Sequence, residues 1–143
     1  MNVNLKKRAA NQILADISIV LVLLVIDQLA KYFAISRNWT ISFNQGISYS
    51  IDLPKNSETY LSLVLLLILA VLYFLVKKSS DKLTIILFLA GGISNLIDRL
   101  DKGVVLDIFK LPNLFFFNFA DLYITLGVLV FIYPRLKRLI FPK

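Results

Sequence analysis

Four long apolar segments limit what this chain can fold into more strongly than any other feature of the sequence. They occupy residues 17–35, 60–76, 83–97 and 119–133. A helix that crosses a membrane needs roughly 20 predominantly apolar residues. The first two segments are long enough, and the other two become so if Asp98 and Asn118 lie at the interface. The chain is 58% hydrophobic with a mean hydropathy of +0.77, which is too apolar for a soluble domain of 143 residues.

We therefore predict an all-α membrane protein that forms a single integral-membrane domain over residues 1–143. Its four transmembrane helices are expected at about 17–35, 59–76, 82–98 and 119–135. Between the first two helices, alternating residues at 39–43 and 47–51 predict a small β-hairpin-like loop around Asn44-Gln45-Gly46. The first segment is too long for the apolar region of a cleaved signal peptide and contains Asp27 and Lys31, so we expect it to be retained.

Basic residues gather in three segments that a four-pass chain places on one side of the membrane. They are Lys6, Lys7 and Arg8; Lys77, Lys78 and Lys82; and Arg135, Lys137, Arg138 and Lys143. The positive-inside rule predicts that this side, with both termini, is cytoplasmic. The net charge of +7 is then explained by topology and contact with anionic lipids, without a nucleic-acid partner.

Five aspartates in or beside the apolar segments fall on the opposite side: Asp27, Asp98, Asp101, Asp107 and Asp121. A carboxylate close to hydrocarbon is costly, which makes each of them a candidate functional residue. The polar residues keep helical spacing within three of the predicted helices, so we expect these helices to turn polar faces toward one another near the outer surface. The second predicted helix has almost no polar residues beyond its first turn and is expected to face lipid.

The chain has no histidine and no cysteine, which excludes Ser-His catalysis, thiol nucleophiles and zinc sites built from these residues. Two mechanisms remain. One is a serine activated by Lys31, with Ser36, Ser48 or Ser50 as the nucleophile. The other is a pair of aspartates that share a proton and activate water.

Asp107 and Asp121 are the natural candidates for such a pair, because both are expected at the water boundary. Asp27 is four residues from Lys31, the spacing of a helical ion pair, and Asp98 is next to Arg99. We therefore expect Asp27 and Asp98 to be structural. Asp101 has no assigned role.

Five runs resemble, in order, the signatures of the bacterial lipoprotein signal peptidases (signal peptidase II). The runs are Asp27-Gln-Leu-Ala-Lys31, Asn44-Gln-Gly46-Ile-Ser-Tyr-Ser50, Gly91-Gly-Ile-Ser-Asn95-Leu-Ile-Asp98-Arg99, Val104-Val-Leu-Asp107 and Phe117-Asn118-Phe-Ala120-Asp121. The resemblance implies an intramembrane aspartic endopeptidase that removes the signal peptide from diacylglyceryl-modified prolipoproteins, cutting before the lipidated cysteine. It also implies a monomer of the bacterial cytoplasmic (inner) membrane that contacts membrane lipids, needs no metal or other cofactor, and has its active site toward the extracytoplasmic face.

The same resemblance assigns residue roles. Asp107 and Asp121 take the catalytic positions, and the substrate-binding and supporting positions fall on Asp27, Lys31, Asn44, Gly46, Asn95, Asp98, Arg99, Asn118 and Ala120. The chain departs from the usual family pattern at Ser48, Tyr49, Ser94, Ile108 and Leu122, and its outer loop is short. These departures bear on substrate preference and loop geometry; Ser94 is expected to crowd a helix contact.

Two non-catalytic alternatives stay open. A small carrier would also bury acids, but would distribute them along a path to both faces, whereas the inner halves of these helices are nearly bare of polar residues. A degenerate relative could bind lipidated peptides without cutting them.

Overall fold

The computed structural model describes residues 3–44 and 56–141. Within them lie four helices, α1 (Val3–Ser36), α2 (Ser57–Leu75), α3 (Ser79–Lys102) and α4 (Phe119–Ile140), each long and apolar enough to span a membrane. The predicted all-α membrane fold is confirmed. α1 begins well before the predicted start at residue 17, because the intervening residues include good helix formers and neither glycine nor proline.

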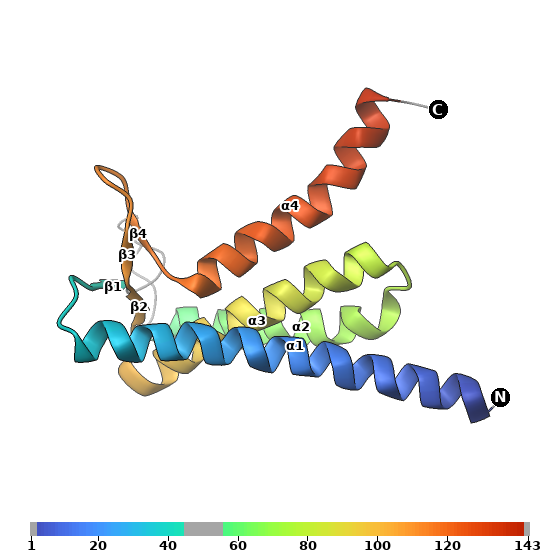
Figure 1. The fold of residues 1–143 in the computed structure, drawn as a ribbon, viewed down its shortest axis with the longest axis horizontal. Helices are drawn as coiled ribbons and strands as arrows, with labels where there is room; N and C mark the ends of the chain where they lie inside the picture. Colours follow the sequence, from blue (N-terminus) through green and yellow to red (C-terminus); the bar gives the residue numbers. More distant parts are fainter. Residues whose placement is uncertain (1–2, 45–55, 142–143) are drawn as a thin grey trace.

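α3 is the central helix of the bundle. It packs against α1, α2 and α4, and half of its membrane-length segment is buried, against 17% or less for each of the other three. α1, α2 and α3 run alongside one another, whereas the C-terminal half of α4 diverges from them (Figure 1). Small residues on α3 allow this close packing: Ala90, Gly91 and Ser94 are all buried. The buried residue of α2 is Tyr73, in agreement with the lipid-facing role expected for that helix.

Within the described residues, four short strands lie at one end of the bundle (Figure 1). β1 (Ser42–Asn44) pairs antiparallel with β2 (Val105–Asp107), and β3 (Phe109–Lys110) pairs antiparallel with β4 (Phe116–Phe117). β1 overlaps the first predicted strand, but the partner that the structure shows for it is β2, which follows α3. The second predicted strand, 47–51, lies outside the described residues. The β1–β2 pair joins the loop after α1 to the loop after α3 and places Asp107 opposite Ser42.

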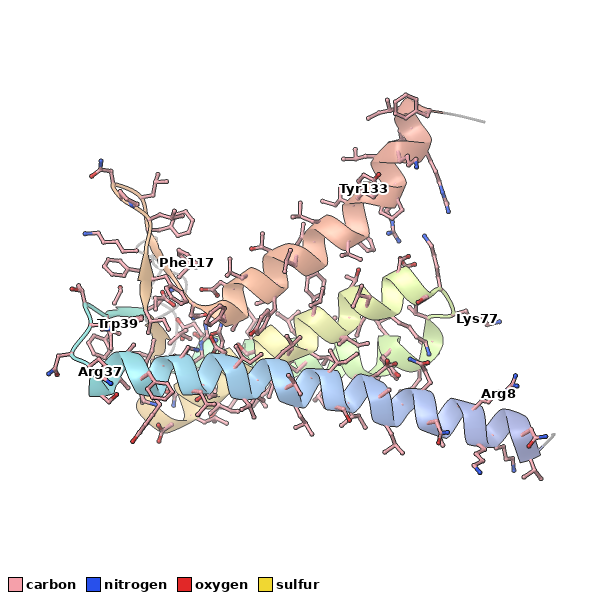
Figure 2. All side chains as sticks on the ribbon, in the orientation of Figure 1. Arg8, Arg37, Trp39, Lys77, Phe117 and Tyr133 are labelled. Atoms are coloured by element: carbon pink, nitrogen blue, oxygen red, sulfur yellow. The ribbon has the colours of Figure 1, made fainter. Side chains whose placement is uncertain are left out.

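Both chain ends and the connection between α2 and α3 lie at the end of the bundle opposite the strands (Figure 1). Arg8 and Lys77 are at this end, while Arg37, Trp39 and Phe117 are at the strand end (Figure 2). The three basic segments therefore share one end, as a four-pass chain requires.

At Gly91, α3 and α4 approach each other closely. A Cβ atom added there would lie 2.5 Å from the Ala120 carbonyl oxygen and 2.7 Å from Cγ1 of Ile124. We predict that Gly91→Ala lowers the free energy of unfolding by about 1–3 kcal/mol through overpacking. Gly92→Ala is the matched control, since its Cβ would meet the flexible end of Leu66 at 2.9 Å. Thermal unfolding in detergent measures both; equal effects would contradict the proposed importance of this contact.

Candidate active site

A buried cluster of three charged side chains lies beneath the strand end of the bundle. Lys31 Nζ on α1 is 2.6 Å from Oδ2 of Asp27 and 2.7 Å from Oδ2 of Asp98 on α3, and none of the three side chains is more than 2% exposed. The Asp27–Lys31 pair has the predicted spacing. The expectation that Arg99 is the cation for Asp98 is wrong, because consecutive helical residues do not face each other and Lys31 occupies that place.

Asp27 connects α1 to two other helices. Its Oδ2 accepts a hydrogen bond from the Ser94 hydroxyl at 2.6 Å, and its Oδ1 accepts one from the backbone N–H of Ala120 at 3.0 Å. Ser94, on α3, is fully buried, and Ala120 is in the first turn of α4. The expectation that Ser94 only crowds a helix contact missed its role as a hydrogen-bond donor.

Asp98 connects the same cluster to β2. Its Oδ2 accepts from the backbone N–H of Leu106 at 3.1 Å, and its Oδ1 accepts from Nε2 of Gln28 at 3.2 Å. Gln28 Nε2 also lies 3.0 Å from Oγ of Ser94. Sequence reasoning overlooked Gln28, although this polar residue directly follows Asp27 within a long apolar segment, which was a possible signal. Hydrogen bonds from α1, α3, α4 and β2 thus surround the three charges.

Two asparagines link the buried charged cluster to Asp107 and Asp121 by hydrogen bonds. Lys31 Nζ donates to Oδ1 of Asn95 at 3.4 Å, while Nδ2 of Asn95 donates to Oδ1 of Asp121 at 3.1 Å. An ammonium has donors only, so it fixes which end of the Asn95 amide faces it and leaves the NH2 for Asp121. Asn118 Nδ2 donates to Oδ1 of Asp107 at 2.8 Å and lies 3.2 Å from Oδ1 of Asn95. The two asparagines therefore bridge the two aspartates.

Asp121 is held by the start of α4. The Asn118 side-chain oxygen accepts from the Asp121 N–H at 2.9 Å, and Oδ2 of Asp121 accepts from the Asn118 N–H at 3.1 Å, which forms a capping box. The N-terminal end of a helix also favours a negative charge. These contacts fix the orientation of the Asp121 carboxyl group at the start of α4.

Asp107 is the last residue of β2 and is only 3% exposed. Burial, followed by the nearby charge of Asp121, raises the pKa of Asp107 from 3.8 to about 6, against the opposing effect of hydrogen bonds from Asn44 and Asn118. The Asn44 amide reaches Oδ2 of Asp107 at 3.2 Å across the β1–β2 pair. A carboxyl in this environment is suited to carrying a proton near neutral pH.

The other predicted residues have distinct positions. Arg99 Nη1 lies 3.5 Å from the Asn95 carbonyl oxygen, and Ala120 contributes its backbone N–H as described. Asp101 is exposed in the last turn of α3 and pairs with Lys102. Gly46 lies outside the described residues. In the part of the chain that the structure describes, no three His, Cys, Asp or Glu side chains form a group that could hold a metal ion.

The serine–lysine arrangement is not formed among the described residues. Lys31 is engaged by two carboxylates, and the hydroxyl of Ser36 is exposed and donates to the Phe33 carbonyl at 2.9 Å. Ser48 and Ser50 lie outside the described residues. The geometry therefore favours the aspartate pair.

Four membrane-length helices with two amide-bridged aspartates at one end define a membrane protein of the aspartic peptidase class. The family model for signal peptidase (SPase) II matches residues 19–137. The lipoprotein signal peptidase of Streptococcus pneumoniae is 32% identical to this chain, and the alignment covers 93% of this chain and 96% of the relative. The lipoprotein signal peptidase of Streptococcus thermophilus is 33% identical, and the alignment covers 79% of this chain and 86% of the relative. A bacterial membrane enzyme solved by the in meso method at 2.3 Å resolution superposes with a TM-score of 0.73 at 25% identity, covering 90% of this chain and 92% of that one.

The chain belongs to the signal peptidase II family. It is accordingly an aspartic peptidase and a multi-pass protein of the bacterial inner membrane.

Removing the Lys31 charge tests the buried cluster. We predict that Lys31→Met lowers the free energy of unfolding by about 3–5 kcal/mol, because it leaves two buried carboxylates without their cation. Lys102→Met is the matched control: its pair with Asp101 is solvent-accessible and such pairs contribute about 0–1 kcal/mol. Denaturation of both variants in mixed micelles gives the comparison, and equal losses would show that the cluster has no special structural role.

Proposed function

We propose that this protein cleaves diacylglyceryl-modified prolipoproteins just before the lipidated cysteine, with Asp107 and Asp121 as its catalytic residues. One observation carries the proposal. The two aspartates come from different elements, β2 and α4, and are bridged by Asn118 and Asn95 at the strand end of the bundle. Lipoprotein signal peptidases among the relatives give the class of substrate.

The environments of the two carboxyls suggest separate roles. Asp121 is partly exposed, starts a helix and accepts hydrogen bonds from two N–H groups, so it acts as the base that takes a proton from water. Asp107 is buried and has a raised pKa, so it holds the proton and donates it to the scissile carbonyl. The attacking group is water, so no covalent intermediate forms with the protein.

A groove of about 490 Å³ between α2, α3 and α4 offers the substrate a route to this pair. Its walls are mainly apolar and include Leu66, Ile124 and Val128, while Asn95 and Arg99 lie among its lining residues. A signal peptide has an apolar segment that is followed by a cleavage site of small residues. The groove fits that pattern, since apolar residues contact hydrocarbon and Asn95 joins the groove to Asp121.

The proposed function includes an orientation of the protein in the membrane and an oligomeric state. The basic segments share the end of the bundle opposite the aspartates, so the positive-inside rule puts both termini in the cytoplasm and the active site toward the extracytoplasmic face. We propose that the enzyme acts as a monomer surrounded by membrane lipids, since Asn44, Asn95 and Asn118 already hold Asp107 and Asp121 within one chain.

Substitution of either aspartate tests the catalytic assignment. Asp107→Asn and Asp121→Asn are expected to lower cleavage of a purified diacylglyceryl-modified prolipoprotein by at least about 10²–10⁴-fold, because each removes the base or the acid. Asp101→Asn is the matched control, since that exposed carboxylate lies outside the site, and it should retain wild-type activity.

Retained cleavage in either site variant would refute the aspartate pair. Serine–lysine chemistry predicts the reverse, namely activity that survives both substitutions. A wild-type protein that binds the substrate and leaves it intact would instead identify a non-cleaving relative.

The pH dependence tests which aspartate carries the proton. The pKa of Asp107 is raised, so its neutral form persists up to a pH of about 6 and is lost above it. We therefore predict that kcat/KM, which reports the free enzyme, falls as the pH rises through about 6. A profile that stays flat between about pH 5 and pH 8 would contradict the assignment of Asp107 as the acid, even if both aspartates prove essential.

A further inference from the structure

A second groove lies between α1 and α2, toward the end of the bundle opposite the active site. Its volume is about 390 Å³ and its surface is almost entirely apolar. α3 forms the floor with Ile86, Leu89 and Ile93, and the walls come from residues 13–21 of α1 and from Ala70 and Phe74 of α2. The groove runs about 12 Å along α1, from Ile13 to Leu21, at 1.5 Å per residue.

A polar contact joins the two walls of this groove. The Tyr73 hydroxyl of α2 donates to Oδ2 of Asp16 on α1 at 2.5 Å, and Nε2 of Gln12 donates to Oδ1 of Asp16 at 2.8 Å. Asp16 is 6% exposed, so the expectation that the inner halves of the helices are nearly bare of polar groups missed one buried acid. Its oxygens are both hydrogen-bonded, and the open surface of the groove is left to hydrocarbon side chains.

Lysine side chains lie at the end of the bundle that contains the Tyr73–Asp16 hydrogen bond. Lys82 Nζ lies 4.9 Å from the centroid of the Tyr73 ring. The floor of the groove is one face of α3, formed by Ile86, Leu89 and Ile93. Lys82 lies on the same face, four residues before Ile86, at the N-terminal end of this row.

Lys77 and Lys78, in the α2–α3 connection, are exposed at this end. Across residues 3–44 and 56–141, none of Lys77, Lys78 and Lys82 takes part in an ion pair. The nearby acid Asp81 is already paired with Arg135 at 3.3 Å. This end of the bundle, beside the groove, therefore has an excess of positive charge even when the Asp16 carboxylate is counted.

We propose that this groove binds one glycerophospholipid with an anionic headgroup, its acyl chain lying between α1 and α2 and its phosphate beside Lys82. The apolar walls match a hydrocarbon chain, and the lysines match a negative headgroup at one end of it. The bound lipid fills the gap between α1 and α2 and so stabilises the half of the bundle that is remote from catalysis.

This site is separate from the proposed active site. Asp16 precedes Asp27 by eleven residues on α1, which corresponds to about 16 Å along the helix. Lipid binding is therefore expected to be independent of the catalytic aspartates, and it does not rest on the proposed reaction.

Native mass spectrometry of the purified full-length protein tests the proposal. The probes are phosphatidylglycerol and phosphatidylcholine with identical acyl chains, supplied at equal concentration to the wild-type protein without substrate. We expect phosphatidylglycerol to bind several-fold better. Lys82→Gln should lower that binding roughly fivefold and leave phosphatidylcholine unchanged.

Ala70→Phe tests the acyl-chain part, because the ring would occupy the groove and reduce the binding of both lipids. Two matched controls should bind like the parent protein. Lys137→Gln removes one charge from the diverging part of α4 at the same end, and Val71→Phe adds a ring at a position of α2 that is 60% exposed and outside the groove. Elution as a single folded species is required of every variant, and thermal unfolding checks it.

Equal binding of the two lipids, or no effect of Lys82→Gln relative to Lys137→Gln, would overturn the headgroup assignment and with it the proposal. Unchanged binding in Ala70→Phe would do the same for the groove. Displacement of the lipid by a prolipoprotein signal peptide would also overturn it, because the groove would then belong to the substrate.

Discussion

The contact of one ammonium with two carboxylates, Lys31 with Asp27 and Asp98, is the interaction on which the rest of the structure depends. Removing ions from water costs several kcal/mol each, and a buried ion pair is tolerated only when its remaining donors and acceptors are hydrogen-bonded. Here the partners come from every neighbouring element, including the backbone N–H groups of Ala120 and Leu106. The charges therefore require α1, α3, β2 and α4 to be in place together.

The same cluster holds the residues of the site in place. Lys31 orients the Asn95 amide, and Asn95 with Asn118 connects the buried charges to Asp121 and Asp107. Preorganised hydrogen bonds of this kind lower the reorganisation that a reaction demands. A pair of carboxyls in unlike surroundings, one buried and one at a helix start, is then available for acid and base roles.

Local patterns in the sequence were sufficient to predict much of this arrangement. They could not predict the contacts between residues that are far apart in the chain. Apolar length predicted the helices, and helical spacing predicted the Asp27–Lys31 pair. The pairing of Lys31 with Asp98 and of Asn44 with Asp107 joins residues more than sixty positions apart, so no local pattern contains it. For the same reason the β1–β2 pair could not be read from alternation. Ser94 was noticed only as a departure from a family pattern, since a single residue does not reveal the carboxylate that it contacts.

The capping box of α4 has a consequence for how this protein can change over evolutionary time. Asp121 both closes the first turn of the helix and offers a carboxylate to the site. A shift of the helix start by one residue would rotate every side chain of that turn by about 100°. Insertions or deletions between β2 and α4 are therefore tolerable only if they leave the starting residue of α4 unchanged, whereas the divergent far end of the same helix is free to vary in length.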